Sequence, residues 1–438
     1  MAAVSSSNYT NAFVRRYNRE LMAQFERHKA PFYDQIQEGK DGGSPSGQGR
    51  YWGITYQNSH AAAAVAAGAD LPAFVQPGVL QGVVTARSLA VSAAWTDEVL
   101  SLGRAEDSIS NVDVVSDIVA RSLDDAMVAL NRQALGHGTG RMAVVEANTS
   151  SATSFVVRNP ESWYQLRVGM SVGFYDTDSG GSLQGNIQTI TDINPDTRTV
   201  TIDAARSLTA GWGLYKAAAA TGGTGATEYG ITAMGLRGTN DNGTLAATIY
   251  GLTRSSNPNV LNAQVLTSST TAGQTYSEAL VRKGINRVRL FNNGEVDQFW
   301  CNLGVLSEHF NSLSGNRMFT VGPEESVPGY DIGNKRDPFF YAGARKIPFK
   351  IDEDLPNREL HGIVTKLWRK HIGRKLNWVG DGTDAEGNPS PILMQLPGTG
   401  TYALSKVAAL YWLGAISHKL PAAGVCFREI ADGELAGD

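Results

Sequence analysis

The stretch SNVDVVSDIVARSLDDAMVALNRQAL, residues 110–135, decides the fold, because it is expected to form one long helix. No proline lies between Pro77 and Pro160, so nothing interrupts the helix. Ser110 is placed to cap its amino end, and Gly136 is placed to end it with a left-handed residue. At the usual rise per residue the helix is about 37 Å long, which few soluble helices reach.

The apolar residues of this helix repeat at three- and four-residue steps and form one stripe. They are Val112, Val115, Val119, Leu123, Ala126 and Leu130. The stripe predicts burial against a sheet or a second helix. We expect Leu123→Asp to break that packing, because it would place an unpaired charge in the middle of the stripe.

The composition favours a globular protein that is rich in strands, turns and long loops. The chain has 438 residues, and at roughly 150 residues per domain this length suggests about three domains. The 48 glycines and the low charged content of 18% argue against a helical bundle. The net charge of −4 argues against a protein that coats nucleic acid, although it permits a shell that encloses DNA without binding it tightly.

The sequence carries no pattern that indicates a catalytic, metal or membrane site. Cys301 and Cys426 are far apart and lack metal-ligand spacing, which suits a reducing cytoplasm. The seven histidines form no metal triad, and the glycine-rich segment 136–140 follows a helix and lacks the ending of a phosphate loop. No run approaches the ~18 apolar residues of a membrane span. We therefore expect no enzyme activity, no cofactor, no metal and no membrane association.

The amino-terminal 49 residues are expected to form an arm. Large apolar residues recur there at four-residue spacing, as in an amphipathic helix: Phe13, Tyr17, Leu21 and Phe25. A Gly-, Ser- and Pro-rich segment, residues 40–49, separates this helix from the rest of the chain. The helix needs a surface to dock on, either on a neighbouring copy or on its own domain.

A long β-hairpin is expected next, within residues 50–86. Residues 51–57 predict its first strand, 59–74 its tip, and 79–94 a returning strand. Its candidate contact residues are Tyr51, Trp52 and Tyr56. Because a two-stranded hairpin is marginally stable alone, it should rest on something else. Two projecting elements before the long helix imply an assembly.

The remainder of the chain mixes strands and helices without strict βαβ repetition, which predicts an α+β fold. Short strands at 168–175, 187–193 and 199–202 indicate a small β-domain inserted at 142–227. Helices are expected at 277–291 and 305–313, and strands at 296–301, 341–351, 361–367 and 425–430, with a long apolar stretch at 402–418.

Two charged clusters are candidate contact sites between copies. The basic residues are Lys366, Arg369, Lys370, Arg374 and Lys375, interleaved with Trp368 and His371. The acidic residues are Asp352, Glu353 and Asp354. The basic cluster is either a solvated face or a surface that meets an acidic neighbour or packaged DNA, and head-to-tail pairing of the two clusters remains open.

Four segments in their order carry a resemblance to a known family. These are 83–100, a strand that leads into a Val-Ser-x-x-acidic segment; the long helix that ends at 136–140; 341–356, with Ile347-Pro348; and 404–430, a long apolar strand, Pro421 and a final strand. In this order they resemble the major capsid protein of tailed double-stranded DNA bacteriophages, whose fold is also found in herpesvirus shell floors and encapsulins.

The resemblance implies a domain plan. It consists of an N-terminal arm (1–49), an extended loop (50–86), a peripheral domain with the spine helix (87–141), the inserted β-domain (142–227), an axial domain (228–401) and the C-terminal strands of the peripheral domain (402–438). The implied function is self-assembly, as pentamers and hexamers, into an icosahedral shell. The shell encloses double-stranded DNA without sequence-specific binding, and it is built in the host bacterial cytoplasm with portal and scaffold proteins and optionally a decoration protein.

Two departures from the family bear on assembly. The amino terminus lacks a long charged helical segment, which implies a separate scaffold or prior cleavage. No lysine occurs between Lys40 and Lys216, so the extended loop has no amine for a covalent cross-link. The alternatives are an encapsulin-like nanocompartment, which leaves the inserted domain unexplained, and a carbohydrate-binding module or an enzyme with an unrecognised site.

Overall fold

The structure is a computed structural model. It describes residues 30–39, 49–57, 64–65, 76–96, 114–158, 165–176, 181–217, 227–268, 273–292, 294–314, 339–342, 345–378, 382–383, 389–390, 394–395 and 405–431. The chain divides into two compact units. Unit 1 comprises Met1–Gln35, Ala86–Arg132 and His371–Gly414, and unit 2 comprises Ile36–Thr85, Gln133–Lys370 and Ala415–Asp438.

Unit 1 is built on two long apolar strands. β3 (Arg87–Thr96) and β21 (Ser405–His418) pair antiparallel, with Leu89 opposite Trp412. β17 (Trp368–Trp378) and β20 (Met394–Gln395) complete the sheet, and β18 (Gly382–Thr383) pairs with β19 (Pro389–Ser390). In the short helix α2 (Pro31–Gln35), the Tyr33 hydroxyl accepts a hydrogen bond of 3.1 Å from Trp412 Nε1.

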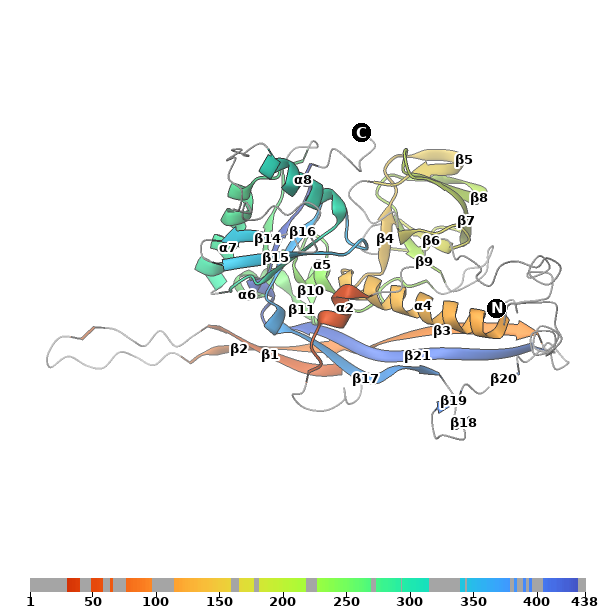
Figure 1. Ribbon diagram of the computed structural model, residues 1–438, viewed down its shortest axis with the longest axis horizontal. Helices are drawn as coiled ribbons and strands as arrows, with labels where there is room; N and C mark the ends of the chain where they lie inside the picture. The colour runs from red at the N-terminus through yellow and green to blue at the C-terminus, as the bar shows by residue number, and fades with distance from the viewer. Residues whose placement is uncertain are drawn as a thin grey trace, which may run out of the picture. The chain divides into compact units, whose positions relative to one another are not determined.

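The predicted long helix is confirmed as α4 (Val114–Leu135), whose axis is roughly aligned with the antiparallel strands β3 and β21 in the view of Figure 1. Ala126 and Leu130 are buried as expected. Leu123, however, is 46% exposed, so its predicted place in the middle of the buried stripe is wrong. The buried face is centred instead on Ser122, Ala126 and Ala129, whose small side chains leave Leu123 at its edge. Val112, Val115 and Val119 lie outside the side chains that the structure describes.

The end of α4 differs from the prediction in one detail. The left-handed residues are Gly138 (φ +86°) and Gly140 (φ +83°) rather than Gly136. A Cβ on Gly140 would lie 2.3 Å from the carbonyl oxygen of Glu228, so only glycine fits there. The Gly136 carbonyl instead accepts hydrogen bonds from the amides of Gly235 and Gly238, both at 3.2 Å.

The centre of unit 2 is a mixed six-stranded sheet in the order β12-β22-β16-β13-β15-β14. The strands are β12 (Gln264–Leu266), β22 (Val425–Phe427), β16 (Leu360–Ile363), β13 (Gln298–Cys301), β15 (Arg345–Ile351) and β14 (Phe339–Ala342). β12 runs parallel to β22 and β13 runs parallel to β15, whereas the other neighbours are antiparallel.

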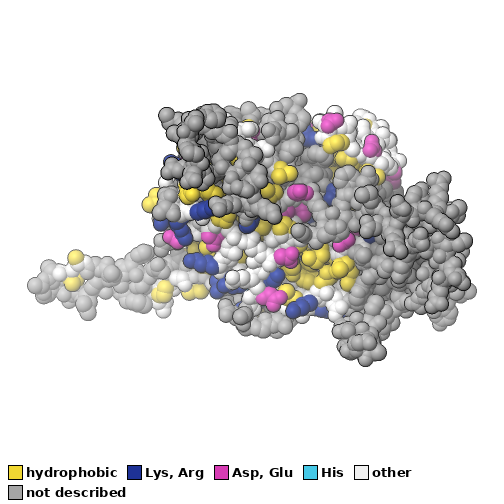
Figure 2. Space-filling model, viewed as in Figure 1, with side chains coloured by type: hydrophobic (Ala, Val, Ile, Leu, Met, Phe, Trp, Pro, Cys, Tyr) yellow, Lys and Arg dark blue, Asp and Glu magenta, His cyan; other side chains and the backbone are white. Residues whose placement is uncertain are grey.

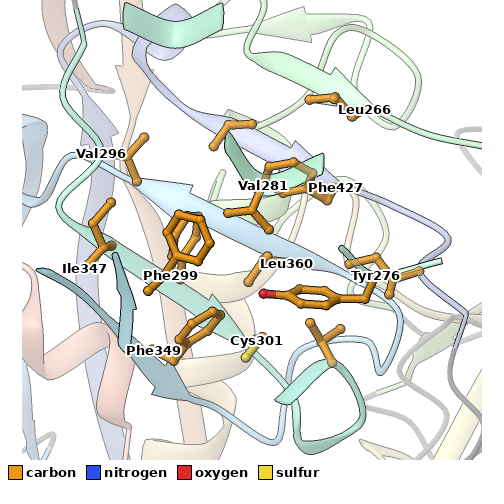
Figure 3. Close-up of a cluster of buried hydrophobic side chains, with 14 of the residues drawn as sticks. Leu266, Tyr276, Val281, Val296, Phe299, Cys301, Ile347, Phe349, Leu360 and Phe427 are labelled. Atoms are coloured by element: carbon orange, nitrogen blue, oxygen red, sulfur yellow. The ribbon is translucent and has the colours of Figure 1, made fainter. Parts of the chain in front are cut away.

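Two helices and this sheet share one hydrophobic core. α7 (Glu278–Asn292) contributes Val281 and Val288, and α8 (Leu303–Ser314) contributes Leu306. The rings of Phe299 and Phe349 stack with centroids 5.3 Å apart, within the cluster drawn in Figure 3.

Two predicted strands of this region are interrupted. The stretch 341–351 is a hairpin of β14 and β15 rather than one strand. The stretch 361–367 leaves the sheet after β16 and forms the 3-10 turn η4 (Thr365–Leu367). The cause is Asp297, whose carboxylate accepts hydrogen bonds from the Thr365 amide at 2.9 and 3.0 Å and from its hydroxyl at 2.7 Å.

The hairpin of β1 (Gly49–Gln57) and β2 (Gly78–Thr85) also belongs to unit 2. The predicted returning strand breaks at Ala86, after which β3 pairs with β21. One face of the hairpin is buried, where Trp52 and Val84 pack in a cluster with Tyr250. A Cβ on Gly82 would lie 2.8 Å from the Tyr250 carbonyl, so glycine permits this close approach.

Residues 141–216 form a separate six-stranded sheet in the order β4-β9-β6-β7-β8-β5. The strands are β4 (Arg141–Val144), β5 (Thr149–Val156), β6 (Ser171–Tyr175), β7 (Gln188–Asn194), β8 (Thr199–Leu208) and β9 (Gly213–Lys216). Val145 bridges to Val157, which joins the two ends of this order and closes the sheet on itself. Its interior is apolar and includes Phe155, Phe174 and Ile202.

Short elements connect these parts of unit 2. They are α5 (Leu236–Thr239), β10 (Thr248–Ile249), β11 (Leu252–Thr253), η3 (Arg254–Ser256), α6 (Pro258–Leu261) and η5 (Pro421–Ala423). Arg254 holds them in place, because its buried guanidinium donates hydrogen bonds to the carbonyls of Gly238, Asp241, Ala246 and Leu261. A buried arginine is tolerated when carbonyl oxygens take up its donors.

Candidate assembly surfaces

The predicted contact residues of the amino-terminal arm are Phe13, Tyr17, Leu21 and Phe25, and they lie outside the described residues.

The hairpin presents an outward apolar face. Tyr51 lies opposite Val83 on the neighbouring strand, and their exposed fractions are 73% and 40%. Val79 is exposed on the same face, two residues from Gln81 and four from Val83 along β2. Tyr56 is exposed too, but its ring lies beside Gly78, on the face that carries Trp52. We call Tyr51, Val79 and Val83 the hairpin face. Trp52, which was also predicted as a contact residue of the hairpin, is only 8% exposed. Its side chain points to the opposite, buried side of the hairpin, so we no longer count it among the contact candidates.

The basic cluster is spread along η4 and β17. In unit 2, Lys366 is exposed, whereas Arg369 and Lys370 are half-buried. In unit 1, Arg374 and Lys375 are exposed, and the Arg374 guanidinium lies 5.6 Å from the centre of the Tyr411 ring. Of the interleaved aromatic residues, Trp368 and His371 are buried. Only the charged side chains are therefore available to a neighbour.

The acidic cluster is smaller at the surface than the sequence suggests. Asp352 and Asp354 are 3% and 6% exposed, so of the three carboxylates only that of Glu353 reaches the surface. Their burial is structural, because the Asp352 carboxylate accepts a 3.0 Å hydrogen bond from the Asp354 amide. The Asp354 carbonyl in turn accepts one of 2.6 Å from Gln165. This corrects the expectation of a three-carboxylate surface.

Two exposed apolar pairs near the central sheet of unit 2 were not predicted from the sequence. Leu290 and Phe291, at the end of α7, are 80% and 73% exposed. Leu303, the first residue of α8, is 44% exposed, and Ile351, the last residue of β15, is 38% exposed. The exposure of Leu290 could have been predicted from the helical spacing, because Leu290 falls opposite the buried residues Val281 and Val288.

A cluster of charged side chains is buried in unit 2. Arg237 Nε and Nη2 donate to Glu359 at 2.8 and 2.9 Å, and His361 Nε2 lies 3.1 Å from the same carboxylate. Arg428 Nη2 lies 2.9 Å from Asp241 Oδ1. Burial raises the pKa of Glu359, but Arg237, His361 and Arg428 outweigh it and hold the pKa well below its ordinary value.

His361 lies between Glu359 and Cys426, an arrangement that resembles a nucleophilic site. Burial lowers the pKa of His361, but the Cys426 and Glu359 side chains outweigh it and raise the pKa to about 9. The side chains of His361 and Cys426 are 0% exposed, so no substrate reaches them in this conformation. The arrangement therefore acts as part of the core.

Within the described part of the chain, no three His, Cys, Asp or Glu side chains are grouped to hold a metal. The described helices include none that is long and apolar enough to cross a membrane.

No protein-family model matches the chain, and no curated protein matches it. Several solved structures, however, match the chain in fold. A chain of the capsid asymmetric unit of cyanophage A-1(L) aligns over 98% of this chain and 100% of its own length, with 10% identity and a TM-score of 0.53.

Two further matches come from a mycobacteriophage and from the capsid of a GTA particle. A chain from Mycobacterium phage Ogopogo is 10% identical, with 98% of this chain and 99% of that chain covered and a TM-score of 0.47. A chain from the capsid of a native GTA particle is 9% identical, with 98% and 100% covered and a TM-score of 0.47. On the strength of the cyanophage match, the chain has the α+β fold of a phage major capsid protein.

Proposed function

We propose that this chain is the major capsid protein of a tailed bacteriophage, which assembles as pentamers and hexamers into an icosahedral shell around double-stranded DNA. The observation that carries the proposal is the fold likeness to the cyanophage A-1(L) capsid chain. That likeness covers nearly the whole of both chains, so it concerns the entire architecture rather than one shared module.

The domain plan follows from this proposal. We assign residues 1–49 to the arm and the β1–β2 hairpin, within 50–86, to the extended loop. Residues 87–141 and 402–438 form the peripheral domain, 228–401 the axial domain, and 142–227 an inserted domain. The closed sheet of β4 to β9 supports the last assignment, because its apolar interior is separate from the core under α7 and α8.

The hairpin face supports a role in contacts between subunits. One side of the hairpin is anchored in its own unit by Trp52 and Val84, and the other side exposes Tyr51 and Val83. Exposed apolar side chains that form a contiguous patch usually mark an interaction surface. A neighbouring copy in a shell would cover them.

The proposed partners are further copies of the chain, with portal and scaffold proteins and optionally a decoration protein, in the virion capsid and, during assembly, in the host bacterial cytoplasm. The net charge of −4 suits a shell that encloses DNA without binding particular sequences. The role is structural, and no catalytic step is assigned to the chain.

The test is expression of the full chain with a scaffold protein, followed by sedimentation and negative-stain microscopy. We expect closed isometric particles built of rings of five and six. Tyr51→Ser with Val83→Ser should lower the particle yield at least tenfold. Val168→Ser is the matched control, since Val168 is 62% exposed and lies outside the hairpin. It should assemble normally.

Monomers alone, at all salt concentrations and with the scaffold present, would contradict the proposal. Small closed shells of one size that need no scaffold would favour the encapsulin-like alternative.

A further inference from the structure

The outer side of α7 combines basic and apolar side chains. The helix carries four basic residues, Arg282, Lys283, Arg287 and Arg289, and one acidic residue, Glu278, which pairs with Arg282 at 3.0 Å. Its last turn exposes Leu290 and Phe291. We call Lys283, Arg287, Leu290 and Phe291 the basic end. Figure 2 shows hydrophobic and basic side chains gathered over the part of unit 2 where Figure 1 places α7.

A second exposed surface has the complementary character. Leu303 and Ile351 are both partly exposed, and Ile351 lies opposite Cys301, two residues before Leu303. Glu353 follows in the turn after β15 and is exposed, and its carbonyl accepts a 3.1 Å hydrogen bond from Asn302 Nδ2. We call Leu303, Ile351 and Glu353 the acidic end. Lys350 precedes Ile351 and so projects from the other face of β15.

The apolar side chains of the two surfaces lie near opposite ends of β13. The chain turns back after α7, where the Gly294 amide donates to the Val288 carbonyl at 3.4 Å, and then enters β13. Leu290 and Phe291 therefore lie near the start of β13, Lys283 and Arg287 lie further back along α7, and the acidic end lies where β13 finishes at Cys301. A single copy cannot bring these two ends together, but two copies related by a rotation can.

We propose that the basic end of one subunit docks on the acidic end of the next copy of this chain, and that this contact closes the capsomer ring. The occupant is a second copy because the two surfaces match in kind: each has two exposed apolar side chains, and their flanking charges have opposite sign. A contact between two different surfaces of identical chains is head-to-tail, and it forms a ring when the rotation closes. The inference rests on the proposed capsid function.

Disulfide trapping tests the contact. Leu290→Cys and Leu303→Cys are introduced singly and together, and oxidised particles are run on a denaturing gel without reductant. The native Cys301 and Cys426 are buried and do not interfere. We expect the double variant to give a ladder up to pentamers and hexamers. An equimolar mixture of the two single variants should give dimers only, and each single variant alone should give monomers.

The outcomes separate this contact from the capsid proposal. Dimers from Leu290→Cys alone would show that two basic ends meet, and would overturn the head-to-tail contact. Intact shells without any cross-link would mean that another segment or protein covers these surfaces, which also overturns it while the capsid function stands. Absence of shells from the unaltered chain would overturn the capsid function itself.

A charge-swap experiment gives an independent readout. Lys283→Glu with Arg287→Glu should lower the particle yield at least tenfold, because like charges would meet at the ring contact. Adding Glu353→Lys should restore the yield, and a triple variant that stays unassembled would contradict the pairing. Asp192→Lys, an exposed change on β7, is the matched control for adding a charge. All variants should unfold at the temperature of the unaltered subunit, since the substituted side chains lie outside the core cluster.

Discussion

Arg237 and Glu359 form a bidentate ion pair inside unit 2, with their side chains 6% and 3% exposed. The two residues are 122 positions apart in the chain, so the pair fixes α5 against the entry to β16. Arg428 adds a third cationic group, with its Nε 3.8 Å from Glu359 Oε1. One carboxylate thus holds three distant segments together.

Replacing this carboxylate should destabilise the subunit strongly. Glu359→Gln removes the carboxylate that pairs with the buried Arg237, whereas Arg428 keeps its ion pair with Asp241. Loss of one partner of a buried pair costs about 3–5 kcal/mol. Urea unfolding of unassembled subunits measures the change. The control is Glu278→Gln, because Glu278 and Arg282 form an exposed pair with side chains 38% and 59% accessible. Loss of such a pair costs about 0.3–0.5 kcal/mol. Equal effects of the two variants would contradict the buried role.

Stability should fall in mild alkali because of His361. Its pKa in the folded chain is about 9, above the ordinary histidine pKa of 6.5. The folded state therefore binds the proton more tightly, so this contribution is complete below pH 6.5 and is lost as the pH rises through about 9. The loss is on the order of 3 kcal/mol.

Urea midpoints between pH 6 and 9.5 measure this loss, and His361→Gln should flatten the profile over that window. A midpoint in the unaltered chain that does not change between these pH values would contradict the ionised state of His361.

Gly284 should not tolerate alanine, although alanine ordinarily favours a helix. A Cβ at this position would lie 2.3 Å from Cζ of Phe427, which packs against α7 in the core. We expect Gly284→Ala to destabilise the subunit by about 1–3 kcal/mol through overpacking. Asn286→Ala, on the exposed side of the same helix, should instead stabilise by up to about 0.5 kcal/mol. Stabilisation by both changes would contradict the close packing of α7.

Mature shells should hold together without covalent bonds from the hairpin. The lysine-free span between Lys40 and Lys216 includes both hairpin strands, so no amine is available there. Contacts that are individually modest suffice in a closed shell, because a subunit leaves only when all of them break. Boiling purified shells in denaturing detergent should return a single 46.8 kDa band. A ladder of covalent multimers under reducing conditions would refute this expectation.

Local patterns in the sequence predicted the elements whose character is set by nearby residues. The long helix 110–135 corresponds to α4, and the alternating stretch 187–193 corresponds to β7 (Gln188–Asn194). The α+β class and the fold likeness also followed from the order of elements. Spacing fixes which residues share a face, but it does not fix which neighbour covers that face. Leu123 is exposed for this reason.

Features that depend on distant pairing were beyond the sequence. The acidic run 352–354 has the pattern of a solvated patch, yet backbone hydrogen bonds turn Asp352 and Asp354 inward. Nothing local distinguishes Glu359 as the centre of a charge network, because its partners Arg237 and Arg428 come from remote segments.

Cryo-electron microscopy of the particles formed by the full chain with its scaffold tests the capsid proposal most directly. We predict an icosahedral reconstruction in which rings of five and six copies each show the hairpin face, with Tyr51 and Val83, covered by a neighbouring copy. A preparation that contains only monomers, or only open assemblies in which Tyr51 and Val83 remain exposed to solvent, would contradict the proposal.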